Sequence, residues 1–179
     1  MICIKCRNKA VVSLKHMGSF CSNCFLSTIE KRIRKDLSIH KVFTPHESVL
    51  VLNDRSLKAK LAIHFLNNIA KSIPLKIDII NAGNTLPRKR YDKIVTPDNL
   101  DDDVSLFVES IFKTGKPVYN LKEVHLLRTV SDEELILIAK QLKLKALLKK
   151  SKLGIVLSRL ESNYPGSKFG LLNSIGELQ

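Results

Sequence analysis

The sequence predicts an α/β protein in which an N-terminal four-cysteine zinc ribbon precedes a domain built on a parallel β-sheet. Two observations predict it. All four cysteines lie within the first 24 residues, and after them short apolar runs alternate with segments of helical periodicity. Alternating strands and helices are typical of parallel sheets, because each parallel connection needs a crossover. We expect a ribbon over 1–25, a basic linker helix over 26–44 and an α/β domain over 45–179.

The cysteines form two CxxC pairs separated by 14 residues: Cys3, Cys6, Cys21 and Cys24. This spacing is typical of a zinc ribbon, with each pair in a tight turn and a hairpin over 10–20 between them. Four thiolates leave no open coordination position, so we expect one structural zinc per chain. An iron–sulfur cluster also accepts four cysteines, and two disulfides would need an oxidising compartment. The spacing favours zinc over both.

The segment after the ribbon predicts an amphipathic helix. Phe25, Ile29, Ile33 and Leu37 recur every four residues and form an apolar stripe. The basic residues lie largely off this stripe, which is the pattern of a solvated face or of a surface that contacts phosphates. We expect four of them to contact an RNA backbone, namely Lys31, Arg32, Arg34 and Lys35.

The distribution of charge supports a polyanionic partner. The formal net charge is +13. Residues 1–41 hold nine Lys or Arg and two Asp or Glu, and residues 140–159 hold seven basic residues and no acidic one. Nucleic acid is the first candidate and an anionic membrane surface the second, while a lysine-rich surface kept for solubility is the alternative. Without a long apolar run or a signal-peptide pattern, we expect a cytoplasmic protein with no membrane partner.

The α/β domain is predicted from short segments in chain order. Strands are expected over 49–52, 74–82 and 91–96, with an extended segment over 118–127. Helices are expected over 57–71, 100–112, 130–144 and 152–163. Ser131 and Glu134 form a capping-box pattern at the start of the third helix. Ligands of parallel sheets bind at the carboxyl ends of the strands, so the turn after Leu52 is the expected site, yet it contains no glycine.

Several stretches together resemble a known family. The ribbon is followed by "CFLSTIEKRIRK", and "YDKIVTPDNLDDDVSLFVESIFKTG", "LKEVHLLRTVSDEELILIAKQLKL" and "LESNYPGSKFGLLNSI" follow in order. In this order the stretches resemble the cytoplasmic tRNA 2-thiolation family, which belongs to the N-type ATP pyrophosphatases, or PP-loop enzymes. The resemblance implies a PP-loop domain of the adenine nucleotide alpha hydrolase-like kind. It also implies a partner tRNA whose wobble uridine is thiolated.

The chain departs from the family at its phosphate loop. The family carries SGGxDS there, while this chain has Asn53, Asp54, Arg55, Ser56, Leu57 and Lys58, and no cysteine follows Cys24. The resemblance therefore implies a degenerate, shortened PP-loop domain with no catalytic and no cofactor-binding residue, similar to the family's non-catalytic subunit. Asp101 and Asp102 match the family's DD pair, and we expect them to cap a helix.

The sequence thus predicts a catalytically inactive tRNA 2-thiolation subunit, a pseudoenzyme, that binds tRNA and an active PP-loop thiolation subunit or forms a homodimer. One alternative is a stand-alone zinc-ribbon RNA-binding or regulatory protein. Another is an active ATP-dependent tRNA sulfurtransferase with an altered loop, in which Arg55, Lys58 or Lys60 holds phosphate.

Overall fold

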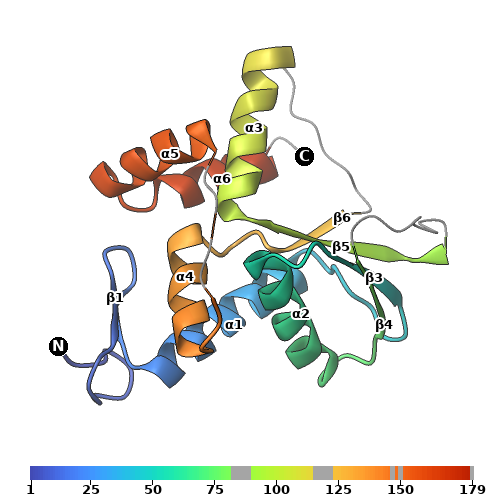
Figure 1. Cartoon of the computed structure of the whole chain (residues 1–179), viewed down its shortest axis with the longest axis horizontal. Coiled ribbons are helices and arrows are strands. Elements are labelled where there is room, and N and C mark those ends of the chain that lie inside the picture. Colours follow the sequence, from blue (N-terminus) through green and yellow to red (C-terminus); the bar gives the residue numbers. More distant parts are fainter. Residues whose placement is uncertain (82–89, 115–122, 146–147, 149–150, 178–179) are drawn as a thin grey trace.

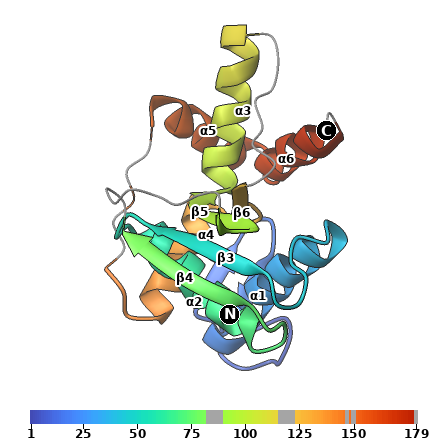
Figure 2. The ribbon, with the colours of Figure 1, turned by 90° about the vertical axis from the view of Figure 1, so that its right-hand side faces the viewer.

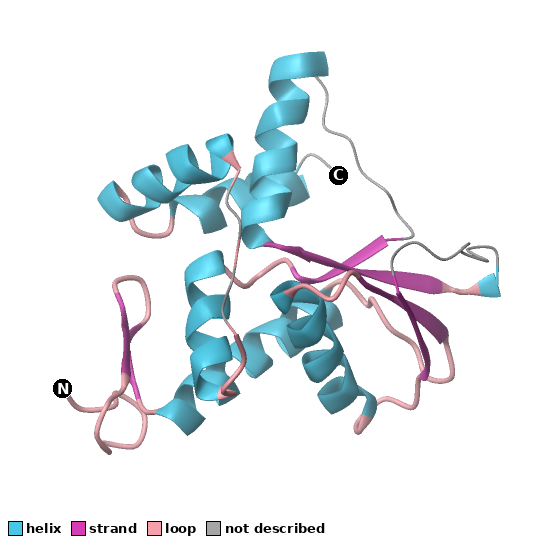
Figure 3. Cartoon of the chain, viewed as in Figure 1, coloured by secondary structure: helices cyan, strands magenta, loops and turns pink. Residues whose placement is uncertain are grey.

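The structure, a computed structural model, places a small hairpin, a parallel sheet and two groups of helices (Figures 1 and 3). It describes all of residues 1–179 except 82–89, 115–122, 146–147, 149–150 and 178–179. Part of the predicted segment over 118–127, and part of the basic cluster over 140–159, fall outside the described residues.

The ribbon contains the predicted hairpin. Strands β1 (Val12–Leu14) and β2 (Gly18–Phe20) pair antiparallel. Gly18 has a φ of +92°, a left-handed backbone that glycine adopts without steric cost. Helix α1 (Ser22–Ile39) follows directly and buries the predicted apolar stripe. The linker helix and its core-facing side are therefore as the periodicity indicates.

The predicted parallel sheet is confirmed. It consists of β3 (Ser48–Asn53), β4 (Lys76–Asn81), β5 (Lys93–Asn99) and β6 (Glu123–Leu127), in the order β4-β3-β5-β6. All three pairings are parallel. The chain passes from β3 to β4 on one side and then returns to build β5 and β6 on the other. The strand order therefore reverses at the carboxyl ends of β3 and β5, where parallel sheets bind ligands.

Helices α1, α2 (Leu57–Ala70) and α4 (Asp132–Gln141) pack against the sheet, with α1 and α4 lying side by side (Figures 1 and 2). They share one apolar core with β3, β5 and β6 and with the inner side of the hairpin. The ribbon therefore belongs to the same core as the sheet.

Three further helices gather beyond the carboxyl ends of β5 and β6 (Figures 1 and 2). They are α3 (Leu100–Thr114), α5 (Lys152–Asn163) and α6 (Ser167–Glu177), and a second apolar cluster joins them. Sequence reasoning missed α6, because glycine, serine and asparagine give it a low intrinsic helix propensity and packing against α3 stabilises it instead. Within the described part of the chain, no helix combines the length and apolarity needed to cross a bilayer.

A buried carboxylate fixes the ribbon to the domain. Glu134 is fully buried at the start of α4, where it completes the predicted capping box with Ser131. One of its oxygens lies 3.3 Å from His16 Nε2 in the hairpin, and the other lies 2.7 Å from Arg32 Nη2 of α1. The ring of Phe169 from α6 lies against both partners of Glu134, 5.2 Å from the Arg32 guanidinium carbon and 5.6 Å from the His16 ring. The hairpin, α1, α4 and α6 thus meet around the carboxylate of Glu134.

Replacing this charge is expected to destabilise the fold. Glu134→Gln should lower the free energy of unfolding by about 3 kcal/mol, because Arg32 would lose its partner in a buried site. Urea denaturation near neutral pH measures the change. Glu133→Gln is the matched control, since Glu133 precedes it on the same helix but is exposed, and it should change the free energy by less than about 0.5 kcal/mol.

The deficit of Glu134→Gln should shrink in acid. Burial acts to raise the pKa of Glu134, but the hydrogen bond with His16 and the charge of Arg32 outweigh it and hold the pKa below its ordinary value of 4.5. A carboxyl with a depressed folded pKa stabilises above its unfolded pKa, and this stabilisation is lost as pH falls through the folded pKa. An equal deficit at neutral pH and at about pH 2 would contradict this assignment.

Candidate functional site

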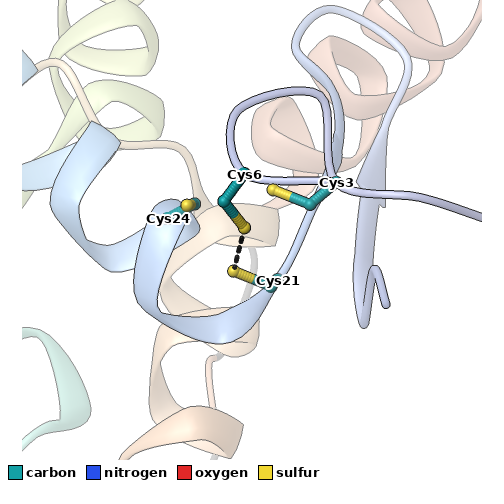
Figure 4. Close-up of side chains that lie close together, drawn as sticks. All are labelled: Cys3, Cys6, Cys21 and Cys24. Carbon is teal, nitrogen blue, oxygen red and sulfur yellow. Dashed lines mark hydrogen bonds between the residues drawn. The ribbon is translucent and has the colours of Figure 1, made fainter. Parts of the chain in front are cut away.

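The four cysteines converge on one point at the base of the hairpin (Figure 4). Their Sγ atoms all lie within 4.8 Å of one another, and those of Cys6 and Cys21 are 3.5 Å apart. The ideal edge of a tetrahedron of sulfurs about one ion is about 3.8 Å, given a zinc–sulfur bond of about 2.3 Å. The predicted ligand set is therefore brought together in a geometry that could hold a metal.

The first pair lies in a tight turn, as predicted. Cys3 is buried, its N–H donates to the carbonyl of Asn8 at 2.8 Å, and its own carbonyl accepts from Arg7 at 3.0 Å. Arg7 has a φ of 62°, which turns the chain back after Cys6. These bonds point both thiols inward.

The second pair differs from the prediction. Cys21 is the N-cap of α1 and Cys24 lies in the first helical turn, with Phe25 N–H bonding to the Cys21 carbonyl at 3.0 Å. The helix N-terminus carries partial positive charge, which favours thiolates. The helix starts here because the apolar stripe begins at Phe25, so helical periodicity overrides a separate turn.

The thiols of this cluster compete for ionisation. Burial acts to raise the pKa of Cys3, yet backbone N–H groups, first that of Cys21, lower it to about 6. The sulfurs of Cys21 and Cys6, followed by burial, raise the pKa of Cys24 to about 12. Neighbouring thiolates repel, so all four ionise together only when a cation lies among them. The cluster is therefore suited to a metal cation.

The four basic residues of α1 divide into two pairs. Arg32 faces Glu134, and Arg34 bonds to Glu30 at 2.8 Å and to the Asn68 carbonyl at 2.8 Å. Both guanidiniums therefore serve the fold. The other two, Lys31 and Lys35, are exposed. The sequence pattern placed all four on one helix but could not show which of them pack against the domain.

In the turn after β3, side chains of the turn itself accept the hydrogen bonds of its backbone N–H groups. Asn53 Oδ1 accepts from the N–H of Arg55 at 3.0 Å, Asp54 Oδ1 accepts from that of Ser56 at 2.9 Å, and Ser56 Oγ caps α2 by accepting from Ala59 at 3.1 Å. Arg55 takes the left-handed φ of 64° that a glycine would otherwise supply. The N–H groups that a phosphate loop presents to its ligand are thus occupied by side chains.

Lys58 points from α2 to the carboxyl ends of the neighbouring strands. Its ammonium lies 2.6 Å from Asp102 Oδ2, 3.0 Å from Asn99 Oδ1 and 3.5 Å from Asp132 Oδ1. Burial acts to lower the pKa of Lys58, but Asp102 and then Asp132 raise it. The lysine is therefore a charged, fixed group at the point where the strand order reverses.

A second lysine joins the same network from α6. Lys168 Nζ pairs with Asp101, whose other oxygen accepts from the backbone N–H of Asp132 at 2.7 Å. The amide of Asn99 donates to Asp132 at 2.9 Å. Asp101 therefore does more than cap α3, because it joins the first turns of α3 and α4 to Lys168. Sequence reasoning missed Asn99, Asp132 and Lys168 as site residues, although all three lie in the stretches that resemble the family: "YDKIVTPDNLDDD", "VSDEEL" and "PGSK".

An acidic cavity of about 390 Å³ opens beside this network. His125 of β6 lies in its wall, with Nδ1 2.5 Å from Asp103 and Nε2 3.8 Å from Asp98. Burial acts to lower the pKa of His125, while Asp103 and Asp98 raise it. The remaining lining is mostly acidic: Asp101, Asp102, Glu109, Glu123 and Asp132, with Ser105, Leu106, Ser151 and Gly154. A polyphosphate could enter this cavity only with accompanying cations.

No protein-family model and no curated protein matches the sequence. Among solved structures, the chain is similar to a U34-tRNA thiolase, NcsA from Methanococcus maripaludis, with its [4Fe-4S] cluster. The TM-score is 0.78 and the identity 18%, over 99% of this chain and 87% of that one. This likeness establishes that the chain has the same fold as that thiolase.

The likeness corrects the prediction of catalytic inactivity. The protein of this fold is a thiolase, hence an enzyme, so the prediction that the chain is a pseudoenzyme is wrong. That prediction depended on the missing glycines of the phosphate loop and on the absence of cysteines after Cys24. The site instead keeps an ordered set of ionisable groups at the strand ends, with Lys58 in contact with Asp102. The cluster of the thiolase also adds iron–sulfur chemistry to zinc as an occupant of a four-cysteine site.

Removing Lys58 should leave the carboxylates of Asp102 and Asp132 without their cation. Lys58→Met is expected to lower the free energy of unfolding by about 3 kcal/mol near neutral pH. Lys60→Met is the matched control, because Lys60 is exposed on the same helix. Burial and the charge of Asp101 already raise the pKa of Asp132. Without Lys58 this carboxyl should protonate more readily, so the deficit should be smaller at about pH 4 than at about pH 7. A deficit that grows in acid would contradict the ion pair.

Proposed function

We propose that this protein acts in the thiolation of a tRNA uridine. The observation that carries the proposal is the structural likeness to a U34-tRNA thiolase along nearly the whole chain. The ordered network at the carboxyl ends of the strands, built from Lys58, Asn99, Asp102 and Asp132, lies where such a fold would place its chemistry. The four-cysteine cluster and the charge of +13 agree with the same role.

The tRNA would bind along α1. Lys31 and Lys35 present exposed ammonium groups on this helix, and phosphate oxygens are their natural partners. Arg32 and Arg34 would contribute indirectly, because their contacts with Glu134 and Glu30 hold the helix in place. The contact would be electrostatic and independent of base sequence.

Zinc is the metal that we propose for the cysteine cluster. Around a [4Fe-4S] cluster each cysteine binds a different iron, so the sulfurs stand further apart than around a single ion. Here they lie within 4.8 Å of one another, which suits one ion at their centre. With four thiolates the ion would have no vacant position and would serve the structure of the ribbon.

The assembly and the compartment are also proposals. The chain would work with an active PP-loop thiolation subunit or as a homodimer, and the exposed apolar side chains of α3 and α5 offer surface for such a contact: Ile111, Phe112, Ile155, Val156, Leu160 and Tyr164. A cytoplasmic location agrees with four thiols that form no disulfide.

Within this function, the chain itself would be catalytic, as an ATP-dependent sulfurtransferase with an altered loop. This activity is favoured by Lys58, a point charge fixed beside Asp102 where the glycines of a phosphate loop are missing. Incubating the purified chain with ATP, Mg²⁺, tRNA and a sulfide donor tests it. Release of AMP that Lys58→Met abolishes and Lys60→Met retains would establish this activity.

Metal analysis tests the cysteine site. Protein purified without added metal should contain one zinc per chain and neither iron nor acid-labile sulfide. Cys24→Ser should lose the zinc and unfold the ribbon, since metal coordination supplies the folding free energy of such sites. Cys24→His, which keeps a fourth ligand of an accepted type, should retain zinc. Iron with acid-labile sulfide in the wild type would favour a cluster instead.

Salt dependence tests the tRNA surface. Changing Lys31 and Lys35 together to Gln should reduce the slope of log K against log salt by about 2, since each lost phosphate contact lowers it by about 1. Filter binding with one tRNA at several salt concentrations measures it. Lys60→Gln with Lys113→Gln removes equal charge from α2 and α3 as a control. An unchanged slope in the first variant would place its lysines on a solvated face without RNA.

A further inference from the structure

The outer face of the ribbon is unusually apolar. Met1, Ile2, Ile4 and Val11 expose 86%, 66%, 63% and 59% of their surfaces, and we call these four residues the ribbon face. The opposite face of the hairpin is already packed into the core through Val12, Leu14 and Phe20. The exposed side chains therefore contribute nothing to the core and are available to a partner.

Contacts place these residues together. Val11 and Ser13 are two positions apart in an extended segment, so their side chains lie on the same side of the hairpin, and Ser13 is exposed. The hydroxyl of Ser13 accepts a hydrogen bond from Ser19 Oγ at 3.1 Å. Met1 Sδ lies 3.6 Å from Ser19 Oγ, and the N–H of Ile4 donates to the Ser19 carbonyl at 3.0 Å. Met1 and Ile4 thus both contact Ser19, the N–H of Val11 donates to the carbonyl of the adjacent Phe20 at 2.8 Å, and Ile2 pairs with Lys9 in an isolated bridge.

A rim of positive charge borders the ribbon face. Lys5, Arg7 and Lys9 are exposed on the same short segment, and residues 1–29 contain no Asp or Glu. An apolar centre with a basic rim is complementary to an apolar centre with an acidic rim.

The chemistry of this face favours a protein partner over RNA and over a second copy of the chain. RNA would pair with the basic rim but leave the aliphatic side chains uncovered, because bases stack on aromatic rings and the ribbon face has none. The ribbon face of a second copy would bring the same basic rim, so that like charges would lie opposite one another at this contact. A protein surface with apolar side chains flanked by carboxylates would cover the aliphatic side chains and also pair with the basic rim.

We propose that the ribbon face is a docking surface for a partner protein that presents apolar side chains bordered by Asp and Glu. This inference goes beyond the proposed function, since it assigns a second surface, separate from the tRNA-binding lysines of α1. Binding would bury the aliphatic side chains, which supply affinity, while the basic rim would speed association and fix orientation.

Cross-linking identifies what covers the face. A photoreactive amino acid in place of Val11, in the full chain produced in its native cells, should form an adduct with another protein. Mass spectrometry of the cross-linked peptide should show apolar residues together with Asp or Glu. An adduct with RNA, an adduct with a second copy of this chain, or no adduct would each overturn the proposal.

Affinity measurements with the identified partner complete the test. Ile4→Ser combined with Val11→Ser should weaken binding at least tenfold, roughly the effect of removing one well-buried aliphatic contact. Ile79→Ser on β4 is the matched control, because Ile79 is 48% exposed and lies outside both the ribbon face and the exposed apolar surface of α3 and α5. Unchanged metal content and unfolding temperature would show that the double variant is folded. Unchanged partner affinity would overturn the proposal, whereas tRNA affinity should stay the same and separates this surface from the proposed function.

Discussion

The arrangement of the whole molecule depends on one buried carboxylate. Glu134 caps the first turn of its own helix and also contacts His16 of the hairpin and Arg32 of α1. Removing a carboxylate from water is costly, so this charge is tolerated only when its partners are all in place. The ribbon, the linker helix and the domain are therefore held in one relative position. Because Arg32 fixes α1 against the domain, it also fixes the position of the exposed lysines on that helix.

The strand-end site follows the same physical rule on a larger scale. Three helices start near the carboxyl ends of the strands, and carboxylates at the first turns of α3 and α4 suit the positive ends of those helices. Lys58 and Lys168 then balance part of the negative charge. The turn before α2 closes on its own side chains. The result is a polar site held together by ion pairs and hydrogen bonds between its own side chains, where a phosphate loop would have glycine-rich backbone.

Local patterns in the sequence were enough for the cysteine cluster, the α1 stripe, the Ser131 capping box and the parallel sheet. Each depends on residues that are close in the chain or on a simple period. The pairing of His16 with Glu134 could not be predicted, because the two residues are 118 positions apart. The same holds for Lys58 and Asp102, which are 44 positions apart. The inference of inactivity failed for a related reason, since it weighed the glycine-free loop and the absence of cysteines after Cys24 without the groups that the fold gathers around that loop.

The start of α1 inside the cysteine cluster has a consequence for the chain as a whole. Cys24 is both a candidate ligand and a residue of the first helical turn, and α1 buries its apolar stripe in the central core. A metal held by the four sulfurs would bind the folded chain in preference to the unfolded one, so its binding free energy adds to the stability of that core. Each tenfold rise in free metal above the dissociation constant then adds about 1.4 kcal/mol. The abundance of folded protein would in this way follow the metal supply of the cell.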